Sequence, residues 1–405
     1  MPRNTKTILF LLAALNFTHI LDFMIMMPLG NYLMPFFSIN PKQFTNLVGA
    51  YTLSAAISGF AAAFFVDRFD RKKVLIIAYS GFLVGTLACG LAPSYHLLLL
   101  ARLVAGLFGG LIGAQVLSII SDIFPYEERG KAMGAVMSAF AVASTFGVPF
   151  ALYLANIISW HAPFILVAVL GLALVPLLNK HIPAITAHID TSEEARPMKV
   201  LTEVLANRKQ VLALLFSGLI MMGHFLIIPF INPFMEFNLG YTKSQTPLVY
   251  LVGGVASFFA ANILGRFADK YGKLKVFSIC IFLSLAMVYI LTNLPKWPLA
   301  LVLALFGIWF VLATGRGVTA QAMVSNVVEP AKRGGFMSFN SSLQQFGTSA
   351  ASFIAGLLVV NDAEGRILHY EWLGYLSIII LLAAFVLGRY LFGKMEQVPK
   401  PSAVS

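Results

Sequence analysis

Long apolar runs separated by short polar breaks dominate the pattern of this chain. Each of twelve runs holds about the 20 residues that a helix needs to cross the hydrocarbon layer of a membrane. The runs are continuous and do not alternate with polar residues, which favours helices over the strands of a barrel. They lie near residues 6–34, 43–66, 74–92, 97–121, 131–155, 162–179, 210–235, 245–266, 275–294, 297–325, 334–360 and 372–393. The pattern predicts an all-α integral membrane protein with twelve transmembrane helices.

The composition agrees with this pattern. The chain is 59% hydrophobic and only 11% charged, with a mean hydropathy of +0.84. A soluble domain carries roughly 25% charged residues, so the expected surroundings of this chain are the lipid bilayer. The two cysteines, Cys89 and Cys280, lie in separate apolar runs. They indicate neither a disulfide framework nor a metal site.

The net charge of +11 would suit a nucleic-acid partner, but its distribution indicates membrane topology instead. With the amino terminus in the cytoplasm, the loops on that side and both tails hold 22 of the 28 Lys and Arg residues. Cytoplasmic loops of membrane proteins carry such an excess, so we expect both termini to be cytoplasmic. The opposite loops hold Lys42, Lys243, Lys296 and Arg366, and two more arginines, Arg102 and Arg316, fall inside apolar runs.

The widest polar break divides the chain into two halves of six apolar runs each. Its stretch Thr186–Pro197 has the composition of a linker, and the residues from Met198 to Asn207 predict a short amphipathic helix on the membrane surface. The expected parts are an N-terminal bundle (1–179), a cytoplasmic linker (180–209), a C-terminal bundle (210–393) and a cytoplasmic tail (394–405).

A short charged loop occurs once in each half. The sequence around Asp67 returns, altered, around Asp269, which lies 202 residues later. Further matches, in the same order and at nearly constant offset, pair His19 with His224, Pro28 with Pro233, and Gln115 with Gln321. Together these matches indicate a duplication. Two parallel repeats joined by a linker are a known plan of membrane transporters, and they would relate the two bundles by a pseudo-twofold axis.

The charged loop carries a recognisable motif. The second copy holds Gly265, Asp269, Gly272 and Lys273 in the pattern Gly-x-x-x-Asp-x-x-Gly-Arg/Lys, whereas the first copy has Ala63 and Asp70 in place of the glycines. This pattern resembles the signature between helices two and three of the major facilitator superfamily, and the likeness extends over the whole chain. The resemblance implies two six-helix bundles that move against each other around a central cavity.

Two further motifs narrow the resemblance. The segment from Arg102 to Gly106 is similar to the family's helix-four motif, in which an arginine within the membrane is linked to proton coupling. Gly147 and Pro149 resemble the helix-five motif of the drug and sugar proton-antiporter branch, although Ala151 stands where a glycine is usual. The resemblance therefore implies an efflux antiporter.

The repeated loops predict a conformational latch. A carboxylate at Asp67 or Asp269 would accept hydrogen bonds from the free amino end of a neighbouring helix, and the resemblance places this contact between the halves. Asp122 would pair with Arg71. The alternative is that the basic residues only enforce topology. The candidate latch residues are Asp67, Arg68, Arg71, Asp122, Asp269 and Lys273.

Asp22 is the one carboxylate well inside an apolar run, and His19 precedes it by three residues. The two side chains therefore project from the same face of a helix. A charge at this depth costs roughly 2.5–3.5 kcal/mol on insertion scales. We interpret Asp22 and His19 as proton-coupling candidates, together with Arg102 as the resemblance implies. The alternatives are a hydrogen-bonded packing role for His19, and a fixed arginine partner or interhelical hydrogen bond for Asp22.

Polar residues on four apolar runs predict a substrate site. Arg316 lies mid-run between two glycines without an obvious carboxylate partner in its half, which favours an anionic or zwitterionic substrate. The resemblance implies that these four runs line the cavity, while the alternative for each amide is an interhelical hydrogen bond. The cavity candidates are Asn16, Gln115, His224, Asn232, Arg316 and Gln321.

These features favour a proton-coupled antiporter that exports a small organic molecule across the bacterial inner membrane, acting as a monomer. One alternative is a proton symporter that takes up a sugar, organic acid or amino acid derivative. Another is a transporter-like sensor that moves nothing. The sequence holds no phosphate-binding loop, metal-ligand cluster or nucleophile–base arrangement, so we expect neither an enzyme nor a bound cofactor or metal. The expected energy source is the proton gradient.

Overall fold

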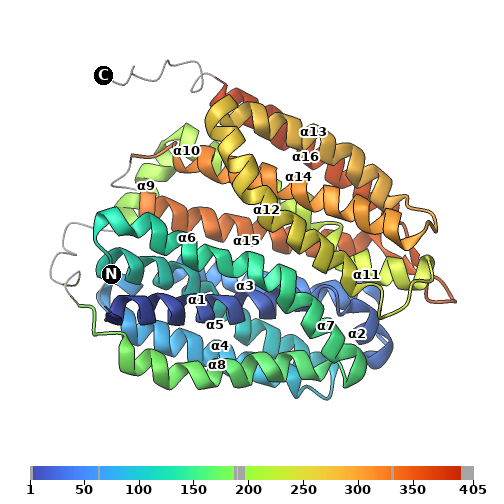
Figure 1. Ribbon diagram of the computed structural model, residues 1–405, viewed down its shortest axis with the longest axis horizontal. Helices are drawn as coiled ribbons and strands as arrows, with labels where there is room; N and C mark the ends of the chain where they lie inside the picture. The colour runs from blue at the N-terminus through green and yellow to red at the C-terminus, as the bar shows by residue number, and fades with distance from the viewer. Residues whose placement is uncertain (1–2, 63, 187–188, 190–196, 330–332, 394–405) are drawn as a thin grey trace.

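The computed structural model describes residues 3–62, 64–186, 189, 197–329 and 333–393. Nearly all of them are helical, and one two-stranded hairpin is the single sheet in these ranges. The helices run side by side along the molecule (Figure 1). The expected tail and the middle of the expected linker lie outside the described residues.

The N-terminal helices follow the first six apolar runs, with two interruptions. A turn at Pro28 breaks the first run, and a π-helical segment precedes Pro149 in the fifth, because proline cannot donate the backbone hydrogen bond of a regular helix. The elements are α1 Arg3–Met26, α2 Gly30–Phe37, α3 Pro41–Ala62, η1 Val66–Arg68, α4 Arg71–Gly90, α5 Tyr95–Ile123, α6 Tyr126–Val142, η2 Ala143–Gly147, α7 Val148–Ile157 and α8 His161–His181.

The C-terminal helices follow a short helix in the linker region, close to where the sequence predicts one. The seventh apolar run is irregular after Phe225, around Pro229 and Pro233. The elements are α9 Pro197–Ala206, α10 Arg208–Phe225, η3 Ile228–Phe230, α11 Ile231–Pro233, η4 Phe234–Asn238, α12 Pro247–Tyr271, α13 Lys273–Thr292, α14 Leu299–Ser325, α15 Arg333–Leu358, β1 Val360–Asn361, β2 Ile367–Leu368 and α16 Tyr370–Phe392.

Ten helical segments among the described residues are long and apolar enough to cross a membrane. Two long helices, α3 and α15, do not reach the same hydropathy. Polar side chains are spread along α15, among them Ser342, Gln344 and Ser349. The structure thus agrees with a helical membrane protein. The expected twelve transmembrane helices are reached only if α3 and α15 also cross the membrane.

The two sets of helices meet at several places. Helix α3 packs along α15, where the Ser349 hydroxyl donates to the Gly49 carbonyl at 3.1 Å and the Phe60 and Phe339 rings lie 5.5 Å apart. Helix α12 packs against η2 and α7, and α2 against α11. In Figure 1 the N-terminal helices, blue to green, lie below the C-terminal helices, yellow to red. The contact surface between the sets is therefore mainly helical, with a smaller contact between α3 and β1.

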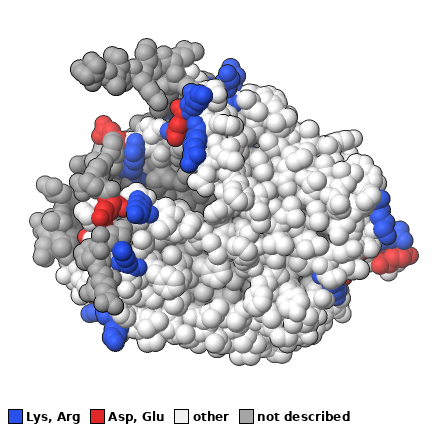
Figure 2. All heavy atoms as spheres, viewed as in Figure 1, with Lys and Arg blue, Asp and Glu red and all other residues white. Residues whose placement is uncertain are grey.

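Charged side chains gather at the two ends of the molecule on the face drawn in Figure 2, and the broad middle is uncharged. We call the end where α1 begins and α16 finishes the terminal end, and the end with α2 and α11 the distal end (Figure 1). At the distal end Asn31 donates a hydrogen bond to Glu236, and the Asn232 amide donates to the Pro28 carbonyl at 3.0 Å. The two sets of helices are thus joined directly at the distal end.

The repeated loop has two different conformations. In the second copy α12 continues to Tyr271 and turns into α13 at Gly272, whose φ is 100°. In the first copy α3 ends at Ala62, η1 follows, and Asp70 precedes α4 with a φ of −55°. Only the second turn uses a conformation that favours glycine, so the loss of this glycine in the first copy has a physical reason.

We predict that Gly272→Ala destabilises the protein by about 1–3 kcal/mol, because an L side chain is strained in this backbone region. The matched control is Gly265→Ala within α12, where an added methyl group meets nothing within 4 Å and alanine favours the helix. Thermal unfolding of the purified protein in detergent measures both. A loss for Gly265→Ala as large as that for Gly272→Ala would contradict the turn as the cause.

Candidate functional site

A buried ion pair joins α1 to α5. The Arg102 Nη1 atom donates to Asp22 Oδ2 at 2.8 Å, and both side chains are 0% exposed. Asp22 Oδ1 and the Nε and Nη2 atoms of Arg102 have no hydrogen-bond partner among the described residues. The sequence marked both residues as candidates, and the structure brings them together.

Tyr51 on α3 connects this ion pair to His19. The Arg102 guanidinium carbon lies 4.2 Å above the centre of the Tyr51 ring, and the Tyr51 hydroxyl lies 3.2 Å from His19 Nε2. Asp22 pairs with Arg102, whereas His19 meets Tyr51 and the edge of Phe82. His19 is therefore linked to the carboxylate through Tyr51 and Arg102.

Tyr51 is not among the candidates that the sequence indicates. The signal that could have found it is the row of glycines on α5, Gly106, Gly109 and Gly110. A side chain at Gly106 would collide with the Tyr51 carbonyl, and a Cβ at Gly109 would lie 2.7 Å from the Tyr51 hydroxyl. The glycines thus let α3 approach α5 closely enough for the Tyr51 ring to lie against Arg102.

The arrangement has a clear chemical consequence. The paired charges are neutral together, and a proton on Asp22 would remove the charge that holds Arg102. The guanidinium would then remain in a buried, uncompensated state, which is strongly unfavourable. Protonation of this carboxylate would therefore favour a rearrangement of Arg102 and of the helices that carry it.

A second buried arginine lies among the C-terminal helices. Arg316 on α14 is 1% exposed, and its Nη2 atom donates to Nδ1 of His224 on α10 at 2.8 Å. The His224 ring lies against Trp309, with centroids 5.0 Å apart. No carboxylate pairs with Arg316 in the described part of the chain. The structure thus groups two of the cavity candidates, His224 and Arg316.

The glutamine candidates have different surroundings. Gln321 is exposed, and its side-chain oxygen accepts from Gln344 at 3.2 Å. Gln344 also donates to the Ser217 hydroxyl at 2.8 Å. Gln115 is 3% exposed, and its Oε1 atom has no partner within the described ranges. These equivalent positions in the repeat therefore do not have equivalent environments.

The structure places two expected cavity residues in packing contacts instead. Asn16 donates to the Val136 carbonyl at 3.1 Å and is 6% exposed, so it joins α1 to α6. Asn232 is 0% exposed and donates a hydrogen bond to the Pro28 carbonyl at the distal end. In both cases the side-chain amide donates to a backbone carbonyl of a neighbouring segment. This is the interhelical hydrogen bond that is the alternative to a cavity role for these residues.

The antiporter-like motif lies where three elements meet. Gly147 ends η2 and faces Leu21 and Phe17 of α1, while Pro149 is the second residue of α7. The same π-helical segment packs against α12 of the C-terminal set. The motif therefore forms a bent part of the surface between the two sets of helices.

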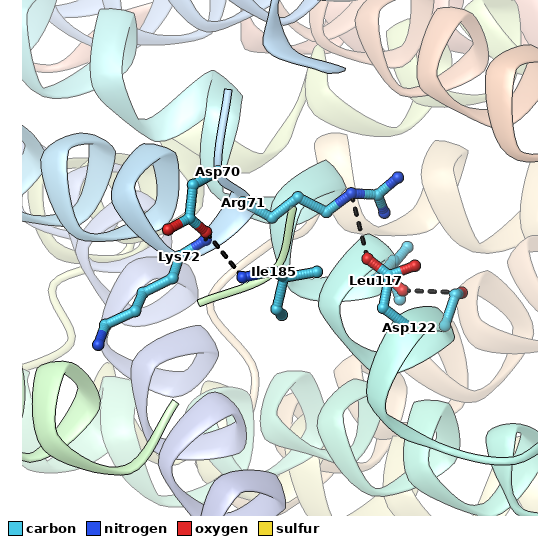
Figure 3. Close-up of polar contacts among 7 residues, drawn as sticks. Asp70, Arg71, Lys72, Leu117, Asp122 and Ile185 are labelled. Atoms are coloured by element: carbon cyan, nitrogen blue, oxygen red, sulfur yellow. Dashed lines mark hydrogen bonds and ion pairs between the residues drawn. The ribbon is translucent and has the colours of Figure 1, made fainter. Parts of the chain in front are cut away.

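The latch candidates lie at the terminal end and are only partly joined. Arg71 Nε lies 3.2 Å from Asp122 Oδ2 (Figure 3), a contact within the N-terminal set. Arg68 is exposed, and so is Asp269, which has no hydrogen bond or ion pair within the described ranges. Lys273 opens α13. The backbone of Asp67 lies in η1, and its side chain is outside the described part of the structure.

Asp70, which replaces a motif glycine, has a structural role that the sequence did not reveal. Its Oδ1 atom accepts from the Lys72 amide at 3.0 Å and from the Ile185 amide at 2.9 Å (Figure 3). The carboxylate thereby caps α4 and fixes the segment that follows α8. An aspartate a few residues before an apolar run, as Asp70 is before the run that starts near residue 74, is the sequence signal for such a cap.

We predict that Asp70→Ala lowers the stability of the protein by about 0.5–2 kcal/mol, the usual cost of losing a helix cap. Asp70→Asn keeps an acceptor oxygen and should lose less. Thermal unfolding in detergent measures both, with the exposed Asp269→Ala as a control that leaves the melting temperature unchanged. Equal melting temperatures for Asp70→Ala and the wild type would exclude the capping role.

Comparison with known proteins places this geometry in a family. The sequence profile of the Major Facilitator Superfamily matches residues 12–315 and, in a second overlapping match, residues 213–404. An uncharacterized MFS-type transporter of Bacillus subtilis (strain 168), YceJ, is 28% identical over 341 residues, which cover 83% of this chain and 85% of that protein.

Solved structures share the fold. A bacterial homolog to the human lysosomal transporter Spinster, in an inward-facing and occupied conformation, has a TM-score of 0.76 and 16% identity, covering 99% of this chain and 100% of that chain. A D-xylose-proton symporter has a TM-score of 0.70 and 18% identity, covering 95% and 97% respectively. This chain belongs to the Major Facilitator Superfamily and is a secondary membrane transporter, not an enzyme.

Proposed function

We propose that this transporter is a proton-coupled antiporter that exports a small organic molecule by alternating access. The observation that carries the proposal is the sealed ion pair of Asp22 and Arg102, with both side chains 0% exposed. Charged groups at membrane depth are costly and commonly mark proton relays and ion pathways. In this proposal the proton gradient supplies the energy for transport, and no bound cofactor takes part.

The proposed topology has twelve transmembrane helices, with α3 and α15 completing the ten apolar segments. These two helices pack on each other between the sets, where polar side chains cost less than they would against lipid. Residues 1–179 and 210–393 form the two bundles. The basic excess on the loops of the terminal end supports a cytoplasmic position for both termini. The distal end then faces the exterior of the bacterial inner membrane.

In the proposed cycle, proton and substrate occupancy alternate. The contacts of Asn31 with Glu236 and of Asn232 with Pro28 hold the distal end closed. A proton on Asp22 releases Arg102, and the helices that carry this pair, α1 and α5, shift against the other set. The irregular η2 segment, which packs against α12, provides a bend near which the sets can tilt. The exposed charges of the repeated loops act as the latch at the terminal end when the distal end is open.

The substrate carries a negative charge, alone or as part of a zwitterion. Arg316 supports this part of the proposal, because its hydrogen-bond partner among the described residues is an imidazole and not a carboxylate. Export is supported by the Gly147 and Pro149 motif at the η2 segment. A proton symporter would use the same ion pair, so the direction of proton movement has to separate the two functions.

The test uses the purified protein in vesicles that contain a trapped pH-sensitive dye. Drugs, sugars and organic acids are added one at a time, and proton flow is followed. We expect at least one compound to drive protons in the direction opposite to its own movement, and Asp22→Asn to reduce this flow to background. Asparagine keeps the shape of the side chain and an acceptor for Arg102, but it leaves the guanidinium without a counter-charge. Thermal unfolding of Asp22→Asn in detergent therefore checks that the variant is folded before its proton flow is measured.

The matched control is Glu364→Gln, which changes an exposed carboxylate in the hairpin loop and should leave the proton flow unchanged. Proton flow in the same direction as the compound would replace antiport by symport. Proton flow in Asp22→Asn equal to that of the wild type would refute the role of Asp22.

A further inference from the structure

The positive charge of Arg316 is unbalanced among the described residues. A guanidinium can only donate hydrogen bonds, so His224 Nδ1, 2.8 Å from Arg316 Nη2, must accept. The imidazole is then neutral and carries its proton on Nε2. His224 therefore fixes the position of Arg316 but leaves its charge in place. Arg102 differs, because Asp22 neutralises it.

Two buried donors on the side chains that contact His224 have no acceptor. Arg316 Nη1 and Trp309 Nε1 lack hydrogen-bond partners among the described residues, and the two side chains are 1% and 0% exposed. Both groups can donate and cannot accept. Buried donors of this kind cost free energy when they stay unpaired. The natural partner of such a donor cluster is an anionic oxygen.

Aromatic rings extend from this donor cluster to the N-terminal helices. Ring centroids lie 5.3 Å apart between His224 and Phe225, and 5.8 Å apart between Phe225 and Phe23. Phe23 follows Asp22 on α1, so this row of rings crosses from one set of helices to the other. His224, Phe225 and Phe23 are only partly buried, so part of the surface of this row remains exposed.

We propose that Arg316, Trp309 and His224 bind the carboxylate of a singly charged substrate whose body is aromatic or similarly apolar. The inference rests on the proposed transport function and names the class of its substrate. Arg316 Nη1 and Trp309 Nε1 donate to the carboxylate, and the ring row from His224 to Phe23 contacts the body of the molecule.

The charge of the site sets the charge of the substrate. One guanidinium and one carboxylate are neutral together, whereas a dicarboxylate or a phosphate dianion would leave a net negative charge at membrane depth, which is costly. Arg102 does not offer a second positive charge, because its Nη1 atom lies 2.8 Å from Asp22 Oδ2 and this carboxylate neutralises it. The site therefore selects monocarboxylates over dianions, and charged molecules over their neutral amides.

Binding to the purified full-length protein in detergent tests this inference without any proton gradient. The probes are benzoate, 4-hydroxybenzoate and 3-phenylpropionate, each beside its amide, with phthalate as the dianion and chloride as a small anion. We expect the monocarboxylates to raise the melting temperature and to bind saturably in calorimetry. The amides, phthalate and chloride should do neither. Failure of all three monocarboxylates to bind, or equal binding by the amides, would overturn the inference.

Two variants of the site and two controls complete the experiment. Arg316→Gln should weaken binding of the monocarboxylates about a hundredfold, as expected for removing one partner of a buried charge pair. Trp309→Phe keeps a ring but removes the N–H donor, and should weaken binding about tenfold. Trp309→Phe keeps the test valid if Arg316→Gln fails to fold. The exposed Arg389→Gln should bind like the wild type.

Asp22→Asn should also bind the monocarboxylates, because Asp22 belongs to the coupling pair and not to the donor cluster. Unchanged binding by Trp309→Phe, and by Arg316→Gln where it folds, would exclude the site. If Asp22→Asn loses proton coupling but still binds the monocarboxylates, the binding site proposed here is supported. If Asp22→Asn kept full proton flow while binding still depended on Arg316, the coupling proposal would fail and the binding site would stand.

Discussion

The ion pair between Asp22 and Arg102 is the interaction on which the rest of this structure depends. Each charge alone would cost roughly 2.5–3.5 kcal/mol at membrane depth on insertion scales, and removing one partner of a buried pair costs about 3–5 kcal/mol. The pair therefore holds α1 against α5 at one point. Tyr51 lies against the guanidinium because the α5 glycines permit a close approach of α3. Any change in the charge of Asp22 must alter the packing of these three helices.

The two sets of helices differ in their buried charges and in the loops of the repeated motif. The N-terminal set holds a balanced pair, whereas the C-terminal set holds Arg316 beside a neutral imidazole. The loops differ in the same way: a glycine with positive φ makes the second turn, and a capping carboxylate at Asp70 makes the first. In the proposed function, the first half carries the proton and the second binds the anion, with a row of aromatic rings between them.

Much of this fold could be predicted from the sequence, because helices in lipid must be long and apolar. The runs located most helices, and the cost of charge in lipid identified Asp22, Arg102 and Arg316. The breaks at Pro28 and η2 were harder to place, since proline indicates a bend but not its form. Asn16 and Asn232 could not be assigned, because a backbone carbonyl on another helix decides their orientation. Tyr51 could not be identified for the same reason: its importance comes from its neighbours on α1 and α5.

The central claim is that Asp22 takes up and releases a proton within the membrane. Infrared spectroscopy of the purified protein during a pH titration tests it most directly, because the C=O stretch of a protonated carboxyl group is distinct and no substrate is required. The account predicts that a carboxyl band from a buried group appears and disappears with pH in the wild type. This band should be absent from Asp22→Asn and unchanged in Glu364→Gln. An identical titrating band in Asp22→Asn would contradict the account.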